Sequence, residues 1–113
     1  MSNLNELKNV IKEFVNERDW GKFHNPKNLS MSIAIESAEL MEIFQWKSIE
    51  ESVNKLSSED IDNIKDEVAD VMIYCLSLCN QLDIDIEEAI LNKMKKNEKK
   101  YPKCKHQKNS CEI

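Results

Sequence analysis

The chain has 113 residues, a net charge of −5, 33% charged residues and a single glycine. This length allows one domain with a modest core, and so few glycines and prolines argue against a β-rich fold with many tight turns. A single glycine also excludes the Gly-rich loops that hold phosphates through backbone N–H groups, and the acidic balance argues against a nucleic-acid partner.

The first predicted helix covers about residues 4–18. One apolar stripe at helical spacing carries it, formed by Leu4, Leu7, Val10, Ile11, Phe14 and Val15. Asn3 with Glu6 resembles a capping box at its start. Residues 19–28 are predicted to form a loop, because this segment holds Gly21 and Pro26.

Further helices follow at intervals marked by capping and breaking residues. The second helix covers about 29–46, and a short third helix is capped by Ser48 and Glu51. The fourth runs from Ser57 or Ser58 to about 81, and the fifth runs from Asp85 to before Pro102. We therefore expect an all-α fold, a bundle of four to five helices within a domain of residues 1–102. Residues 103–113 are expected to be a disordered tail.

The sequence shows no apolar segment of the kind that directs secretion or spans a membrane. The N-terminus lacks the apolar run of a signal peptide, and no apolar stretch is long enough to span a bilayer. We therefore expect a cytoplasmic protein without a membrane partner. In that compartment the four cysteines are expected to be free thiols.

The most informative feature is the position of four acidic residues. The predicted helices 29–46 and 58–81 are apolar around nearly their whole circumference, which is typical of buried helices. Each nevertheless carries two acids three residues apart, Glu36 with Glu39 and Glu67 with Asp70. Residues at this spacing share one helix face, so each pair points in one direction.

Carboxylates gathered in a dry interface repel one another unless a cation compensates them. No lysine or arginine occurs between residues 28 and 46 or between 66 and 92. A hard divalent cation with oxygen ligands solves this problem, and Mg²⁺ is the usual partner of phosphates. The alternative is that these acids are solvated, since a single such pair is common on any helix.

At these residues the chain resembles the MazG-like, all-α nucleotide pyrophosphohydrolases. The family hallmark is ExxE followed by ExxD, and here it is Glu36-Ser-Ala-Glu39 and Glu67-Val-Ala-Asp70. The segments that resemble the dCTP pyrophosphatase branch are ERDWGKFHNPKNL, EIFQWK, DVMIYCLSL and KMKKNEKKYP. The resemblance covers about residues 4–102.

This resemblance implies a role for each matching residue. Glu36, Glu39, Glu67 and Asp70 would bind one or two Mg²⁺ ions, which Mn²⁺ can replace, and would form the catalytic group. The phosphates would be reached by Lys93, Asn97, Lys100 and Tyr101. The base would lie among Trp20, His24 and Trp46. Lys100 stands where relatives often carry arginine. The lysine keeps the positive charge but lacks the bidentate fork of arginine. The family implies a homo-oligomer, with a tetramer favoured over a dimer.

The expected reaction cleaves a nucleoside triphosphate, dCTP or a modified pyrimidine deoxynucleotide, to the monophosphate and pyrophosphate in nucleotide pool sanitation. A metal-activated water would attack the α-phosphorus, with Glu39 as the proton acceptor. The alternatives are a helical dUTPase, a broad house-cleaning phosphohydrolase, or a non-catalytic helical adaptor. A di-iron protein is disfavoured, because His24 and His106 lie outside the predicted helices.

Overall fold

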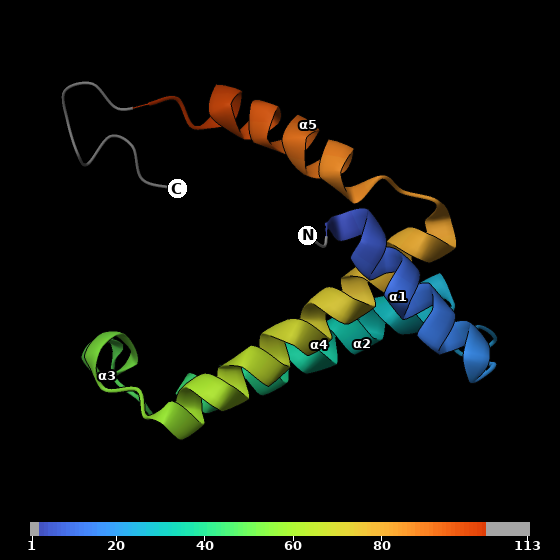
Figure 1. Cartoon of the computed structure of the whole chain (residues 1–113). Helices are drawn as coiled ribbons and strands as arrows, with labels where there is room; N and C mark the ends of the chain where they lie inside the picture. The colour runs from blue at the N-terminus through green and yellow to red at the C-terminus, as the bar shows by residue number, and fades with distance from the viewer. Residues whose placement is uncertain (1–2, 104–113) are drawn as a thin grey trace. The chain divides into compact units, whose positions relative to one another are not determined.

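The computed structural model describes residues 3–103, and helices dominate this range. They are α1 (Leu4–Glu17), α2 (Pro26–Phe44), α3 (Ile49–Asn54), α4 (Ser58–Leu82) and α5 (Ile86–Lys100) (Figure 1). The chain divides into two compact units after Asp83, with α1–α4 in the first and α5 in the second. The predicted all-α class is confirmed. The predicted disordered tail lies outside the described residues, apart from Lys103.

Each helix begins at a polar residue that caps it. The first N–H groups of a helix lack a partner within it, and a short polar side chain can supply one. In every case the capping side chain accepts from the backbone N–H three residues on; the capping residues are Asn3, Asn25, Ser48, Ser57 and Asp85. At α3 the bond is reciprocated, because the Ser48 N–H donates to Glu51 Oε1 over 2.9 Å.

One predicted boundary is wrong. The sequence suggested a loop through residue 28, but α2 begins at Pro26, three residues before the expected position. The cause is Asn25, whose Oδ1 accepts from the Asn28 N–H over 2.9 Å. Proline suits the first turn of a helix, because its fixed φ matches the helix and the N–H that it lacks would be unpaired there. Pro26 is therefore the first residue of α2 and does not belong to the preceding loop.

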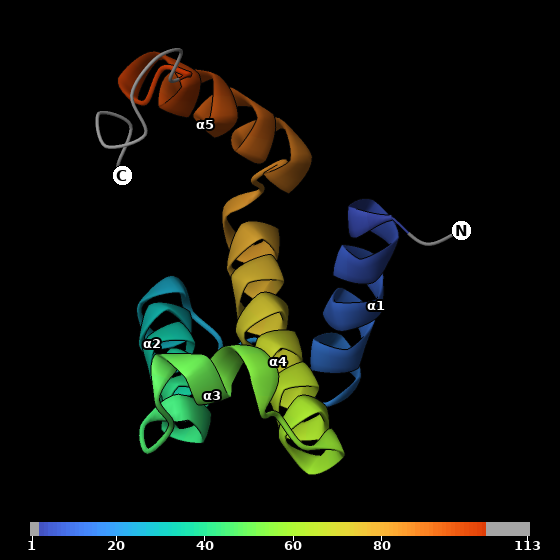
Figure 2. The same ribbon diagram turned by 90° about the vertical axis from the view of Figure 1, so that its left-hand side faces the viewer.

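The first unit is built around the pairing of α2 with α4. These helices run side by side in opposite directions with α3 in their connection, and α4 lies between α2 and α1 (Figure 2). Leu29 of α2 and Leu76 and Cys79 of α4 are the buried apolar side chains. Asn80 ties α1 to α4, because its Nδ2 donates to the Lys8 carbonyl over 3.0 Å. This arrangement sets the acidic positions of α2 against those of α4.

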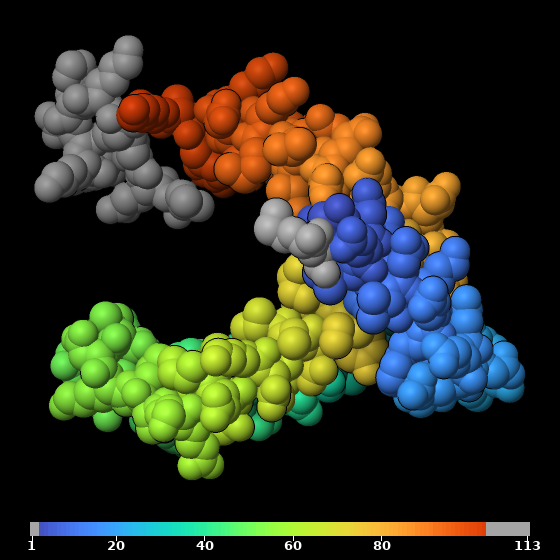
Figure 3. Space-filling view, in the orientation of Figure 1, coloured from blue at the N-terminus to red at the C-terminus, as the bar shows by residue number. Residues whose placement is uncertain are grey.

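The apolar circumference of α2 and α4 is only partly covered in the single chain. Ile35 is 59% exposed and Met41 is 71% exposed on α2. Val68 and Met72 of α4 are also exposed, and the α4 surface (green to yellow) is open along much of its length in Figure 3. A single chain therefore covers one face of each helix and leaves another open, so the expected burial is incomplete within one chain. None of the helices in residues 3–103 is both long and apolar enough to cross a membrane.

Candidate metal centre and adjoining cavity

The structure brings three of the four predicted acids into one tight group. Glu36 of α2 and Glu67 and Asp70 of α4 each offer a carboxylate oxygen, and these three oxygens lie within 4.8 Å of one another. All three side chains are half-buried. Glu39, one turn beyond Glu36, is exposed and lies beside the group. The acids of α2 and α4 thus lie together between the two helices, with three in the tight group and Glu39 beside it.

Among residues 3–103, no ion pair compensates the charge of this group. The ion pairs found in the described part of the chain lie elsewhere, the better buried one joining Lys47 to Asp60 over 3.1 Å. Glu36 Oε2 and Glu67 Oε2 are buried without a hydrogen-bond partner. Buried carboxylate oxygens are normally paired, so these two atoms fit a group that binds a cation.

The pKa values of Glu36 and Glu67 are both raised in this group. The pKa of Glu36 is raised to about 7, chiefly by burial and also by hydrogen bonding with Glu39 and Glu67 and by the charges of Glu39 and Asp70. Burial is also the main cause that raises the pKa of Glu67. At neutral pH and without metal, Glu36 is therefore protonated in part of the molecules.

These residues fit a divalent cation. Their donors are all carboxylate oxygens, which Mg²⁺ and similar hard cations prefer. Three carboxylate oxygens are fewer than the ligands that such a cation takes, so water or phosphate would supply the others. Glu39, Glu67 and Asp66 also line an open hollow of about 440 Å³ beside the group. A charged ligand therefore has a route to it.

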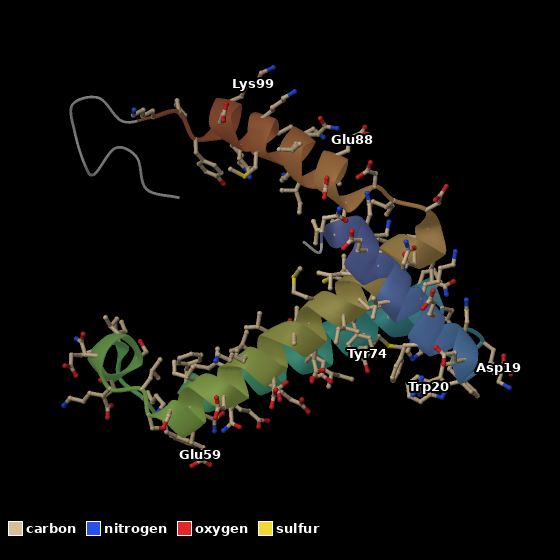
Figure 4. All side chains as sticks on the ribbon, viewed as in Figure 1. Asp19, Trp20, Glu59, Tyr74, Glu88 and Lys99 are labelled. Atoms are coloured by element: carbon tan, nitrogen blue, oxygen red, sulfur yellow. The ribbon has the colours of Figure 1, made fainter. Side chains whose placement is uncertain are left out.

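A second, largely apolar cavity of about 360 Å³ adjoins the acidic group. Helix α1, the loop after it and α4 form its walls, and Asp70 is part of its lining. Four rings follow one another along this wall: Phe14 to Trp20 at 5.5 Å, Trp20 to His24 at 5.8 Å, and His24 to Tyr74 at 6.1 Å between centroids. Trp20 and Tyr74 lie near the junction of α1 and α4 in Figure 4. Asp70 thus connects a carboxylate cluster with a cavity of aromatic character.

Comparison with known proteins identifies the family. A family model described as MazG-like matches residues 31–112. The chain belongs to the MazG-like family. It is 36% identical over 100 residues to dCTP pyrophosphatase 1 of Bos taurus and to that of Homo sapiens, which covers 88% of this chain and 59% of each relative. The chain thus spans about 59% of the length of these relatives.

A solved structure agrees with this assignment. A pyrophosphatase from Archaeoglobus fulgidus is 46% identical to the MazG-like chain and superimposes with a TM-score of 0.83. The match covers 91% of this chain and 95% of the archaeal one. The likeness therefore extends over nearly the whole of both chains.

The MazG-like chain does not bring all three predicted base-binding residues together. Trp20 and His24 lie before α2 and line the apolar cavity. Trp46 follows the end of α2 and is 88% exposed. Between the two tryptophans lies α2, whose 19 residues make a helix about 28 Å long at 1.5 Å per residue. The apolar cavity of the single chain therefore includes Trp20 and His24 but not Trp46.

The predicted phosphate-binding residues lie on α5 or directly after it, in the second unit. Lys93, Asn97 and Lys100 follow the spacing of one helix stripe, and both lysines are exposed. The Lys100 Nζ lies 5.3 Å from the centre of the Tyr101 ring. Their role toward phosphates stays a prediction.

Sequence reasoning assigned no site role to Phe14 and Ser77, both of which line the apolar cavity. Phe14 was counted only as part of an apolar stripe. A signal for Ser77 was present, because Asp70, Tyr74 and Ser77 follow the spacing of one helix stripe. Nothing in the sequence marked that stripe as facing α1, which depends on how the helices pack.

Proposed function

We propose that this MazG-like protein is a Mg²⁺-dependent nucleoside triphosphate pyrophosphohydrolase, acting on dCTP or a modified pyrimidine deoxynucleotide. The observation that carries the proposal is the group of three carboxylate oxygens within 4.8 Å, two of whose residues keep a buried unpartnered oxygen. The relatives named dCTP pyrophosphatase 1 and the archaeal pyrophosphatase support the reaction type.

Each residue has a proposed role that follows from its position in the structure. Glu36, Glu67 and Asp70 would hold the metal, since their oxygens form the tight group. Bound there, Mg²⁺ supplies neutralisation of phosphate charge and a water of lowered pKa. Glu39 is exposed beside this group and is the carboxylate best placed to accept a proton from the attacking water. Lys93 and Lys100 would neutralise charge on the departing pyrophosphate.

The active form is proposed to be a homo-oligomer, a tetramer in preference to a dimer. Two observations support assembly: the open apolar faces of α2 and α4, and the separation of Trp46 from Trp20. A partner chain that covers Ile35 and Met41 would remove apolar surface from water. The same partner chain would bring its own Trp46 toward the helices of this chain.

A metal-dependent screen of the deoxynucleoside triphosphates tests this function. We expect pyrophosphate and a monophosphate as products with Mg²⁺, and no turnover after chelation with EDTA. Release of orthophosphate would contradict attack at the α-phosphorus. Preference for dUTP over dCTP would favour the helical dUTPase alternative, and comparable rates on many nucleotides would favour a house-cleaning enzyme.

The Glu39→Gln variant separates an enzyme from a helical adaptor. This change keeps the size of the side chain and removes its ability to take up a proton. We expect a folded variant with its pyrophosphate release reduced by about 10²-fold or more, the scale at which general base catalysis contributes. An unchanged rate would exclude Glu39 from the reaction.

A further inference from the structure

Two buried polar atoms of the apolar cavity have no partner. Ser77 of α4 is 5% exposed, and its Oγ makes no hydrogen bond. The Nδ1 atom of His24 is likewise buried and unpartnered. Both residues line the cavity that Phe14, Trp20 and Tyr74 enclose. The aromatic cavity therefore contains a small polar surface.

This pair is unusual for a packed interior. More than nine in ten buried polar groups have a hydrogen-bond partner, and a serine inside a helix commonly donates to the carbonyl one turn earlier. Other serines of the chain behave in this way, such as Ser52, whose Oγ donates to the Ile49 carbonyl over 2.6 Å. An alanine at position 77 would avoid the unpaired hydroxyl without changing the helix. The exception at Ser77 points to a ligand that supplies the missing partner.

The position of the pair indicates what kind of ligand this is. Asp70, Tyr74 and Ser77 all line the cavity along α4, and Asp70 also belongs to the carboxylate group. A molecule whose charged end lies at the carboxylates can therefore extend along α4 into the cavity. Its flat part would lie among the rings of Phe14, Trp20 and Tyr74, and its far edge would meet Ser77 and His24.

The space beyond the pair has polar side chains along part of its wall, next to Ile11 and Val15. Ser77 and His24 also line a smaller neighbouring cavity of about 150 Å³, whose other walls include Lys12, Asn16 and Asn80. An edge that carries hydrogen-bonding groups is therefore accepted at this end, whereas an apolar ring edge would leave both atoms unpaired. A serine hydroxyl both donates and accepts, and Nδ1 does one or the other according to its tautomer.

We propose that Ser77, together with His24, hydrogen-bonds the polar edge of the substrate's nucleobase and helps determine which base the protein accepts. This inference rests on the proposed nucleotide substrate and adds a specificity-determining residue to it. The rings provide stacking that tolerates any base. Ser77 and His24 would provide the discrimination, because a site with buried hydrogen-bonding groups disfavours a base that cannot pair with them.

Binding of unphosphorylated nucleosides without metal tests the proposal independently of catalysis. The full chain in EDTA is titrated with 2′-deoxycytidine, deoxythymidine, deoxyadenosine and deoxyguanosine, and binding is followed by amide chemical shifts. We expect wild-type protein to prefer one base. Ser77→Ala should bind that base about three- to ten-fold more weakly, the effect of one neutral hydrogen bond, and should discriminate less among the four.

Two variants and one stability measurement complete the test. His24→Phe keeps a ring and removes both nitrogens, so it should reduce discrimination as Ser77→Ala does. Ser30→Ala is the matched control, because the Ser30 Oγ already donates to the Lys27 carbonyl on the outside of α2; it should bind all four nucleosides as wild type does. Thermal unfolding should show Ser77→Ala to be as stable as wild type or more stable, since an unpaired buried hydroxyl is lost.

Other outcomes would overturn the inference. Equal affinities and an unchanged base preference in Ser77→Ala would remove Ser77 from base recognition, even if the enzyme hydrolyses nucleotides as proposed. If no nucleoside binds to wild-type protein, the inference fails, and a changed oligomeric state of Ser77→Ala would then indicate that a second copy of the chain fills the cavity. Clear base-selective binding without any hydrolysis would support the inference while the proposed reaction fails.

Discussion

A carboxylate oxygen of Glu36 in α2 lies within 4.8 Å of one from Glu67 in α4, and each residue has a buried oxygen, Oε2, without a hydrogen-bond partner. The two residues are joined by the connection through α3, so their meeting depends on the pairing of α2 with α4. Carboxylates held this close without a cation repel each other, and the fold must hold them against that repulsion.

Removing one of these ligands should remove the stabilising effect of magnesium. A ligand that binds only the folded state stabilises it by about 2.7 kcal/mol at one hundred times its dissociation constant. We therefore expect Mg²⁺ to raise the melting temperature of wild-type protein and to have little effect on Glu67→Gln. Asp62→Asn, at an exposed position of the same helix, is the control and should respond as wild type does. Differential scanning fluorimetry with and without Mg²⁺ measures this, and an equal response of Glu67→Gln would remove Glu67 from the site.

The metal-free protein should lose stability as the pH rises toward neutrality. The pKa of Glu36 is about 7 in the folded protein against an ordinary value of 4.5, with burial as the main cause. A raised pKa means that the contribution of this group to stability is complete below 4.5 and is lost as the pH rises through 7. Urea unfolding in EDTA between pH 5 and about 8 should show this decline, and Glu36→Gln should reduce it.

Magnesium should act in the opposite sense over the same range. Metal binding needs deprotonated carboxylates, so the affinity for Mg²⁺ should increase as the pH rises through the pKa of Glu36. Calorimetric titration with Mg²⁺ at several pH values checks this. An affinity that does not change between pH 6 and about 8 would show that Glu36 does not exchange a proton for the metal.

The open apolar faces of α2 and α4 predict self-association. Stable interfaces bury about 1,600 Å² in total, and an unpaired charge in such an interface is costly. Ile35 is 59% exposed in the single chain, so Ile35→Glu should leave the fold of one chain intact while it weakens assembly. Light scattering after size exclusion should find an oligomer for wild type and a smaller species for the variant. Lys95→Glu, at an exposed position of α5, should assemble as wild type does. A monomeric wild type would contradict the prediction.

Lys93 should contribute to the use of triphosphates without contributing to the fold. It is exposed on α5, and the family resemblance assigns it to the phosphates. A charge-assisted hydrogen bond contributes about 1.5–3 kcal/mol, so Lys93→Ala should lower kcat/KM about 10- to 100-fold. Lys95→Ala, at a neighbouring exposed position, is the control. Steady-state rates of pyrophosphate release decide this, and equal rates for both variants would exclude the role of Lys93.

The helices and the acidic doublets could be predicted from the sequence because both are local. Capping residues such as Asn3, Ser57 and Asp85 act within three residues of themselves, and an i, i+3 spacing sets both acids of a pair on one face. The error at the start of α2 arose from a local conflict, since Pro26 can end a helix or begin one and only the Asn25 cap decides between them.

The sequence by itself determined an all-α chain, the ends of most helices and the two acidic pairs that are proposed to bind a divalent cation. Only the tertiary structure decided that Glu36, Glu67 and Asp70 form the tight group while Glu39 lies beside it, and that Asp70 also lines an aromatic cavity containing Ser77. The physical reason is that helix periodicity fixes directions around one axis, whereas the rotation and register of α2, α4 and α1 against one another follow from side-chain packing between segments far apart in the chain.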